Sequence, residues 1–521
     1  MFTIKQKTSG IIENNGSLVF SPDSSLAGDA GTGYPRLLTL RHNGVSNGMI
    51  IITFDYTAVI NGSQTWPFYR STDGGSTWEH YSDFIGSDVG YPRLMNPMIF
   101  EVPFKMGSLS EGTLLLTGNL KPEDESTTNI IIFQSKDLGQ TWSYLSMVDK
   151  GGPAIYDPSP SSTTTAVWEP FLAVSAKNEL IVYYSDERQK DKGILQALVQ
   201  RISPDGGITW GELINVVGIP NKSDRPGMIT MTDLPNNTKL ITYEVVNRPS
   251  LNQDSAQVYF KTSPDGTTWD SEDLGVPITA IDSHAIGSSP YVKWIDNGEV
   301  NGIIVVGSKW ALDPNGNIEE GQNFYVNRDL GQGYWQRLPM AVSFDSADDS
   351  AYLTGMSQSL EINFDGTSLL QAVNVQNEIT KLNDIRVGAL PIYPVIYEAE
   401  NASLTNVRQV AHYDASNSLK IGDINYSDSS ILFSNIIAQQ SGQHYINIRY
   451  DNGSGDICTH FLIVNSDEPI KIEYSPTKNW GRFLWKSIPI ALNQGINSIR
   501  IRESIGFTEI DCIQVYYEPS V

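Results

Sequence analysis

Two glutamates, Glu169 and Glu244, carry the side chains best suited to acid–base or nucleophilic chemistry. Cleavage of a glycosidic bond needs such a carboxyl pair, because one group gives or takes a proton while the other attacks the sugar or activates water. A simpler explanation is also open, in which each glutamate forms an ion pair with an arginine such as Arg36 or Arg225. The choice between them depends on the elements that position the two glutamates.

A repeated turn motif identifies those elements. Four segments read Ser-x-Asp-(x)-Gly-x-Thr-Trp or a shortened form of it, and a fifth is degenerate. In such a hairpin turn the aspartate accepts hydrogen bonds from amides, a glycine adopts positive φ, and the threonine closes the loop over the tryptophan. We therefore expect these residues to be structural. The segments are 71–78, 135–142, 203–210, 263–269 and 327–335.

Prolines mark the strand that opens each repeat. Pro35, Pro97, Pro170, Pro226 and Pro290 each stand 33 to 38 residues before the start of one of these turns. A sixth opening, at 357–362, lacks the proline. Each unit holds about four short strands, as a propeller blade does. The sequence therefore predicts a six-bladed β-propeller over residues 1–390, closed by an outer strand from the segment 10–20, because closure removes exposed edges.

Polar residues gather at one end of the predicted blades. The inner strands open with polar residues that we align as equivalent, including Arg36, Glu169 and Arg225, and the second strands end on Asp55, Asn119, Ser185, Glu244, Ser308 and Asn374. Equivalent strand ends converge on the central channel of a propeller, where a ligand can bind. The predicted catalytic residues are Glu169 and Glu244, and the predicted substrate-binding residues are Arg36, Asp55, Trp168, Arg225 and Tyr243. For Trp168, packing between blades is an equally open alternative.

The pattern changes near residue 393. From there to residue 521 short alternating strands follow one another, which predicts a β-sandwich of the jelly-roll kind. The whole chain is therefore expected to be all-β. Cys458 and Cys512 both lie in this part, and the sequence leaves open whether they form a disulfide bond.

Composition narrows the class of ligand. The chain has 35 Lys and Arg against 59 Asp and Glu, a net charge of −24. Such a surface repels phosphate backbones, so we expect no nucleic-acid partner, and a neutral sugar fits better. The six histidines have no metal-ligand spacing, so no catalytic cofactor is expected.

Location and assembly are predicted from the same composition. No run of about 18 apolar residues exists, so no membrane partner is expected. The first ten residues contain no apolar signal-peptide core, so the protein is either cytosolic or a mature form with a start methionine added. The abundance of Asn, Ser, Thr, Gly and Tyr favours the second, secreted form, and we expect a monomer.

Several motifs resemble glycoside hydrolase family 93 over residues 10–390, and the repeated turns resemble the Asp-box repeats of sialidases. The resemblance implies a secreted, retaining exo-α-1,5-L-arabinanase that releases arabinobiose from plant cell-wall arabinan or a related polysaccharide. It also implies that Glu169 and Glu244 are the catalytic pair, and we favour Glu169 as nucleophile and Glu244 as acid/base. The motifs are Tyr34-Pro-Arg-Leu37, Val167-Trp-Glu-Pro-Phe-Leu172, Tyr183-Tyr-Ser-Asp-Glu187 and Tyr243-Glu244.

Two other functions remain open. A sialidase needs three arginines on its substrate carboxylate, and only Arg36 and Arg225 stand at blade openings that we align as equivalent. A non-catalytic carbohydrate-binding propeller is the second alternative, in which the glutamates only order the channel.

The last domain resembles family 35 carbohydrate-binding modules, relatives of family 6. The resemblance implies a structural Ca²⁺ held by Glu398, Glu400 and Asp511, and oxygen ligands suit calcium. Ordinary surface carboxylates are the alternative. Trp480 is the candidate sugar platform, whereas Trp485 fits a core position better. The motifs are Tyr397-Glu-Ala-Glu400, Arg449-Tyr-Asp-Asn452, Gly495-Ile-Asn-Ser-Ile-Arg500 and Glu509-Ile-Asp-Cys-Ile-Gln-Val515.

Overall fold

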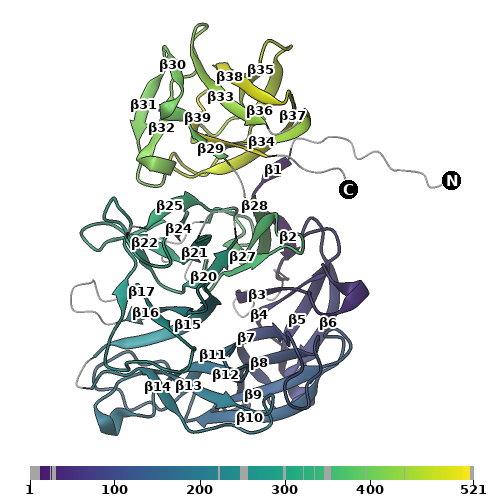
Figure 1. Cartoon of the computed structure of the whole chain (residues 1–521), viewed down its shortest axis with the longest axis vertical. Coiled ribbons are helices and arrows are strands. Elements are labelled where there is room, and N and C mark those ends of the chain that lie inside the picture. Colours follow the sequence, from purple (N-terminus) through teal and green to yellow (C-terminus); the bar gives the residue numbers. More distant parts are fainter. Residues whose placement is uncertain are drawn as a thin grey trace, which may run out of the picture. The chain divides into compact units, whose positions relative to one another are not determined.

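The chain folds into two compact units that are built from β-strands (Figure 1). One unit comprises Ser17–Gln336 and Phe344–Leu390, and the other comprises Arg337–Ser343 and Pro391–Val521 with the segment up to Gly16. The computed structural model describes residues 12–23, 25, 31–220, 223–246, 256–296, 301–320, 322–333, 335–344, 354–392, 395–438 and 441–516.

The first unit is a six-bladed β-propeller, as predicted. Its first three blades are four-stranded antiparallel sheets that follow one another along the chain. Blade 1 contains β3 (Thr32–Thr39), β4 (Ile50–Ile60), β5 (Ser63–Ser71) and β6 (Glu79–Ile85). Blade 2 contains β7 (Arg93–Glu101), β8 (Leu114–Lys121), β9 (Thr128–Ser135) and β10 (Ser143–Gly151). Blade 3 contains β11 (Val167–Val174), β12 (Leu180–Asp186), β13 (Ala197–Ser203) and β14 (Ile214–Val217).

The other blades are less regular. Blade 4 contains β15 (Arg225–Asp233), β16 (Lys239–Val246), β17 (Gln257–Ser263) and β18 (Val276–Pro277), and its sheet continues through β19 (Ala285–Gly287), β22 (Trp310–Leu312) and β23 (Ile318–Glu320). Blade 5 contains β20 (Tyr291–Ile295), β21 (Ile303–Gly307), β24 (Asn323–Asn327) and β25 (Gln336–Pro339). Blade 6 contains β26 (Ser359–Ile362), β27 (Ser368–Gln376), β28 (Asn383–Pro391) and the N-terminal strand β2 (Ser17–Phe20).

The innermost strands form a closed ring. β3 contacts β7, β7 contacts β11, β11 contacts β15, β15 contacts β20, β20 contacts β26, and β26 contacts β3 again. The ring closes inside blade 6, where Ser17 and Leu18 of β2 pair with Val387 and Arg386 of β28. The predicted N-terminal closure is therefore present, and it fixes all blades around one channel.

The repeated turns have the predicted geometry. In the first of them the backbone N–H and the hydroxyl of Thr77 donate to the two carboxylate oxygens of Asp73 at 2.9 and 2.7 Å. Gly75 has φ +93°, and the Trp78 indole donates to its carbonyl at 3.1 Å. These residues hold the β-hairpins, and the same Asp–Thr pairing recurs at Asp137, Asp205 and Asp265.

The second unit is a β-sandwich with a core of buried aliphatic residues between its two sheets. One sheet contains β31 (Arg408–Ala411), β32 (Leu419–Gly422), β39 (Glu509–Tyr516), β34 (Gly442–Asp451), β37 (Leu484–Leu492), β1 (Ile12–Asn14) and β29 (Val395–Glu398). The other contains β30 (Ser403–Thr405), β33 (Ser430–Ala438), β38 (Gly495–Ile505), β35 (Cys458–Val464) and β36 (Ile470–Tyr474).

The domain boundaries differ from the predicted 1–390 and 393–521. Strand β1 pairs with β37 of the sandwich, so residues 12–14 do not belong to the propeller. The physical reason is that β37 would otherwise present unpaired backbone groups at a sheet edge. Arg337–Ser343 also group with the sandwich, and residue 393 lies outside the described residues.

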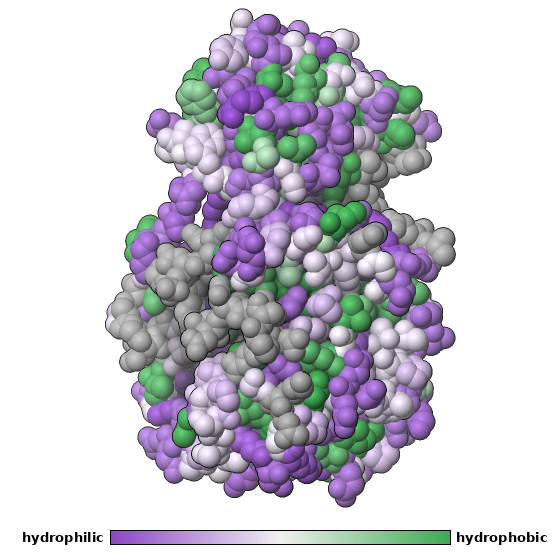
Figure 2. All heavy atoms as spheres, turned by 90° about the vertical axis from the view of Figure 1, so that its left-hand side faces the viewer, coloured by the Kyte–Doolittle hydropathy of each residue, from purple (hydrophilic) through white to green (hydrophobic). Residues whose placement is uncertain are grey.

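Helical structure among the described residues is limited to short 3₁₀ segments. They include η2 (Gly44–Ser46), η3 (Gly86–Val89), η4 (Lys190–Lys192), η6 (Ala399–Asn401) and η7 (Ser416–Ser418). Within the same ranges we find no helix with the length and apolarity needed to span a bilayer. Hydrophilic residues predominate on the face drawn in Figure 2, with hydrophobic residues scattered among them. Cys458 and Cys512 are both buried and free, which answers the open question of a disulfide bond.

Candidate active site

A β-bulge recurs at the same place in the inner strands of the propeller. In blades 1 to 4 the strand register shifts there, after Gly33, Met95, Trp168 and Gly227. The residue at the bulge has a left-handed backbone, which is uncommon for residues other than glycine and re-aims the side chain. These residues, with the matching ones of blades 5 and 6, are Tyr34, Asn96, Glu169, Met228, Ser289 and Ser357, with φ between +48° and +60°.

The polar ends of the second strands face these bulges, as predicted. Asp55, Asn119, Ser185 and Glu244 pair with equivalent positions of their inner strands. Three of these side chains latch the next blade, because each accepts a hydrogen bond from the backbone N–H of that blade's bulge residue. The pairs are Asn96 N to Asp55 Oδ2 at 2.9 Å, Glu169 N to Asn119 Oδ1 at 2.8 Å, and Ser289 N to Glu244 Oε2 at 2.7 Å.

Blade 3 departs from this rule at Glu169. Its second strand carries Ser185 at this position, whose side chain is too short to accept the bond from the next blade. The Glu169 carboxylate accepts that bond, from Met228 N, instead. Oε2 of Glu169 accepts Met228 N at 3.0 Å and Ser185 Oγ at 3.2 Å. Oε1 accepts the Tyr34 hydroxyl from blade 1 at 3.1 Å. Glu169 therefore lies where blades 1, 3 and 4 meet, on the channel axis.

The ionisation of Glu169 is coupled to that of Glu244. Burial, with a further contribution from the charge of Glu244, raises the pKa of Glu169 to about 7 against the lowering effect of its three hydrogen bonds. Burial also raises the pKa of Glu244, while its bond from Ser289 N and the charges of Lys309 and Arg225 act in the opposite sense. Two interacting carboxyls lose their protons in separate steps that belong to the pair.

Neither arginine expected at this site forms an ion pair with the two glutamates. Arg36 is buried, and it donates to the Ser357 carbonyl and hydroxyl at 2.8 Å each. Its guanidinium lies 5.6 Å from the ring centre of Tyr34 and 5.4 Å from that of Tyr291. Arg36 therefore adds positive charge beside Tyr34, and its contact with a substrate stays a prediction.

Arg225 pairs with a different carboxylate. Its NH2 group lies 2.8 Å from Oε1 of Glu187, and both side chains are almost fully buried. The same oxygen accepts the Trp168 indole at 3.1 Å. The simple ion-pair explanation for Glu169 and Glu244 is therefore wrong, because the arginines are engaged elsewhere.

The predicted equivalence of Arg36 and Arg225 is also wrong. The register aligns Tyr34 with Met228, so Pro35 corresponds to Ile229, and Pro226 stands three residues too early. Proline is favoured directly after the bulge residue, because a proline disfavours the helical region of φ and ψ at the residue that precedes it. In blade 4 the bulge forms without a proline at this position.

Tyr243 does not face the channel. Neighbouring residues of a strand point to opposite faces, so Tyr243 points away when Glu244 points in. Its hydroxyl donates to the Leu274 carbonyl, and its ring stacks on that of Tyr259 with centres 6.4 Å apart. Asp55 is a latch: it also accepts the Trp66 indole at 3.0 Å, and burial raises its pKa to about 6.

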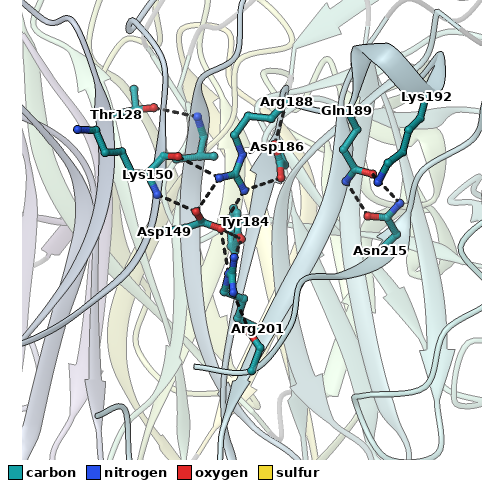
Figure 3. Close-up of polar contacts among 12 residues, drawn as sticks. Thr128, Asp149, Lys150, Tyr184, Asp186, Arg188, Gln189, Lys192, Arg201 and Asn215 are labelled. Atoms are coloured by element: carbon teal, nitrogen blue, oxygen red, sulfur yellow. Dashed lines mark hydrogen bonds and ion pairs between the residues drawn. The ribbon is translucent and has the colours of Figure 1, made fainter. Parts of the chain in front are cut away.

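A buried charge cluster supports the end of β12 that carries Ser185 and Glu187 (Figure 3). Arg188 donates to both Asp149 and Asp186, at 2.6 and 2.8 Å. Burial acts to raise the pKa of Asp149, but hydrogen bonds from Arg188 and Tyr184 hold this pKa well below its usual range. The cluster is fully paired, which marks it as structural.

Sequence reasoning missed three residues of the site: Tyr34, Glu187 and Lys309. Tyr34 precedes Pro35 as Glu169 precedes Pro170, so the shared bulge position could have identified it. Lys309 follows the predicted strand end Ser308 directly, and burial lowers its pKa to about 8 against the charge of Glu244. Glu187 gave no signal beyond its place in a motif.

The sandwich gathers the three predicted calcium ligands. Burial, together with the charges of Asp511 and Glu400, raises the pKa of Glu398 to about 8. Oε2 of Glu398 and Oε2 of Glu400 are buried without a hydrogen-bond partner, whereas Asp511 pairs with Arg449. Across the described ranges, no three His, Cys, Asp or Glu side chains form a ready metal cluster. The orphaned oxygens fit a cation, which would need backbone carbonyls or water as further ligands.

Trp480 borders a cavity of the sandwich of about 340 Å³. The side chain is 45% exposed, whereas Trp485 is buried, in agreement with the expected contrast between platform and core. Charged and aromatic side chains share the cavity wall, among them Arg408, Asp423 and Phe507.

Two of the solved structures similar to this chain are arabinan-degrading glycosidases. An α-L-arabinanase of Penicillium chrysogenum complexed with arabinobiose is 28% identical with a TM-score of 0.61, over 74% of this chain and 99% of that one. A family 93 α-L-arabinofuranosidase of Fusarium graminearum with arabinobiose is 25% identical with a TM-score of 0.59, over 73% and 98%. No family model and no curated protein matches the chain. The predicted resemblance to glycoside hydrolase family 93 is confirmed.

Proposed function

We propose that the protein is an exo-acting, retaining glycoside hydrolase that cleaves α-1,5-linked L-arabinan and releases arabinobiose. The observation that carries the proposal is the Glu169–Glu244 pair, two half-buried carboxyls from successive blades with coupled ionisation and no arginine partner. Similar structures of arabinan-degrading enzymes with bound arabinobiose support the substrate class.

The hydrogen bonds support a division of roles between the two glutamates. Glu169 accepts hydrogen bonds from Tyr34, Ser185 and the Met228 amide, and these three donors act against burial and favour the charged form that a nucleophile needs. Two of these donors, Ser185 and the Met228 amide, bind Oε2, whereas only Tyr34 binds Oε1. Oε1 therefore keeps a free lone pair, and it is the oxygen that attacks the anomeric carbon. Glu244 then protonates the leaving oxygen and later takes a proton from water.

The sialidase alternative is weaker. Arg225 is committed to Glu187 and Arg36 to Ser357, so neither guanidinium is placed to clamp a substrate carboxylate. A non-catalytic sugar-binding propeller requires only that the glutamates order the channel, and Glu244 does latch Ser289. Asp55 and Asn119 accept the equivalent hydrogen bonds in their own blades. The latch alone therefore does not require a glutamate at position 244.

Incubation with linear α-1,5-arabinan separates these functions. We expect release of arabinobiose as the main early product, measured by anion-exchange chromatography, and no action on a sialoside. A protein that binds arabinan without releasing sugar would instead be a binding propeller. Release of free sialic acid from the sialoside would favour the sialidase alternative.

We also propose that the sandwich is a carbohydrate-binding module that holds a structural Ca²⁺ through Glu398, Glu400 and Asp511. The orphaned carboxylate oxygens support the ion, and exposed Trp480 beside its cavity supports sugar binding. When bound, the ion would neutralise the mutual repulsion of these carboxylates, and Ser416 would continue to orient Glu398 through its 2.7 Å bond.

A further inference from the structure

A loop on the catalytic face presents an aromatic ring that the proposed reaction does not yet use. Residues 152–166 join β10 to β11, and β11 opens with Trp168 and Glu169. The loop is anchored at its base, where Gly152 N donates to the Thr165 carbonyl at 2.8 Å and Ala154 N to the Glu125 carbonyl at 3.0 Å. At its tip Ile155 is 54% and Tyr156 63% exposed.

The exposed ring of Tyr156 is held from below by Arg225. The guanidinium carbon lies 5.3 Å from the ring centre, and NH1 donates to the Asp157 carbonyl at 3.4 Å. Arg225 is itself immobilised by its buried pair with Glu187. A cation on one face orients an aromatic ring and leaves the remaining surface to solvent.

Tyr156 is connected to the catalytic centre by a short chain of contacts. Oε1 of Glu187 accepts both Arg225 and the Trp168 indole, at 2.8 and 3.1 Å. Trp168 is only partly buried and directly precedes Glu169. Tyr156, Arg225, Glu187 and Trp168 thus form one contiguous wall beside the reacting carboxylate.

We propose that Tyr156 and Trp168 form a substrate subsite that binds an arabinofuranose unit beyond those that the shortest cleaved oligosaccharide occupies. The inference rests on the proposed arabinan hydrolysis. Sugar rings present C–H groups to aromatic faces, and a rigid aromatic side chain supplies contact area with little loss of conformational freedom. The buried Arg225–Glu187 pair serves as the support of this wall, which explains why a buried charge pair stands so near the catalytic face.

The test compares substrate lengths in three variants. Tyr156→Ala should lower kcat/KM on long linear α-1,5-arabino-oligosaccharides by about tenfold, and change it less than about twofold on the shortest cleaved oligomer. Tyr156→Phe keeps the ring and should match the wild type. Ile155→Ala changes the neighbouring exposed side chain and should do the same.

Equal effects on all lengths, or no effect on long oligomers, would overturn the subsite. Unchanged rates on the shortest oligomer show that the variant is folded. If the wild-type protein cleaves no arabinan, the proposed hydrolysis fails, and the subsite is judged by binding instead. Titration with arabinohexaose, followed by tryptophan fluorescence, must then show weaker binding by Tyr156→Ala than by Tyr156→Phe, and equal binding would contradict the subsite.

Discussion

The propeller and the sandwich each bury a group of carboxylates, and the two groups differ in how their oxygens are satisfied. In the propeller, both Glu169 oxygens and one Glu244 oxygen accept hydrogen bonds. In the sandwich, Glu398 and Glu400 each keep one buried oxygen without a partner, and Arg449 pairs directly with Asp511.

The difference separates two uses of buried charge. Around Glu169, neutral donors orient the carboxyl and the nearby arginine is bound to Glu187, so the raised pKa values of Glu169 and Glu244 are not offset by a direct ion pair with an arginine. Around Glu398, unsatisfied oxygens and mutual repulsion favour an incoming cation. Burial alone raises carboxyl pKa values in both places, so the partners distinguish an acid–base pair from an ion site.

Loss of either catalytic glutamate should have the largest effect. If activity survived, the contrast between an acid–base pair in the propeller and an ion site in the sandwich would fail. Glu169→Ala and Glu244→Ala should each lower kcat by several orders of magnitude on arabinan. Azide should restore turnover to Glu244→Ala with retained configuration, and Glu169→Ala should give an azide product of inverted configuration. The opposite pattern exchanges the two roles.

A matched variant separates the chemistry of Glu244 from its latch. Glu244→Gln can still accept from Ser289 N, so it should keep the wild-type melting temperature and lose activity as Glu244→Ala does. Asp55→Asn makes the same change at an equivalent latch and should remain active. Activity in Glu244→Gln would show that this residue is only a latch.

Removal of Arg225 should have the next largest effect, on stability. Arg225→Met removes one of the two cations paired with the buried Glu187 and leaves Lys190 at 3.4 Å as its remaining partner, so the loss of unfolding free energy should be at most about 3–5 kcal/mol. The double variant Arg225→Met/Glu187→Gln should recover much of this loss in urea denaturation. Without recovery, the pair would not be the support of the Trp168 wall.

Chelation should affect the sandwich and spare the propeller. A ligand that binds only the folded state raises its stability, so EDTA should lower the melting temperature of the sandwich transition. Glu398→Gln should reduce the response to EDTA, whereas the exposed substitution Glu468→Gln should not. An EDTA-independent melting curve would remove the calcium site from this account.

The smallest expected effect is a pH dependence of stability that originates at Glu169. Its pKa is raised in the folded state to about 7, so the fold favours the neutral form. This contribution is fully present below the unfolded pKa of about 4.5 and is lost as pH rises through 7. Glu169→Gln should therefore raise the melting temperature by a few degrees at pH 8 and leave it unchanged at pH 4. Equal shifts at both pH values would point to a packing effect instead.

Local patterns in the sequence were sufficient for the blades and for the catalytic candidates. The Asp73 turn has a geometry fixed by its own residues, so its repeats could be counted, and Glu169 and Glu244 followed from their places in the blades. Contacts between blades could not be read this way. The bond from Tyr34 to Glu169 joins residues 135 positions apart.

Two errors have a common origin, because both assigned positions without knowledge of the strand register. Pro226 suggested that Arg225 was equivalent to Arg36, whereas the bulge register places Met228 at the shared position. Tyr243 was assigned to the channel by adjacency to Glu244, although strand alternation sends it to the opposite face. Register, set by pairing across the sheet, decides both cases.

The stereochemistry of sugar transfer tests the central claim most directly. In the presence of methanol, a retaining enzyme passes the glycosyl group from Glu169 to the alcohol, so ¹H NMR should show a methyl α-L-arabinobioside formed from an α-1,5-arabino-oligosaccharide. The same product should be absent with Glu169→Ala. A methyl β-glycoside, or hydrolysis with no transfer to methanol, would contradict a covalent intermediate on Glu169.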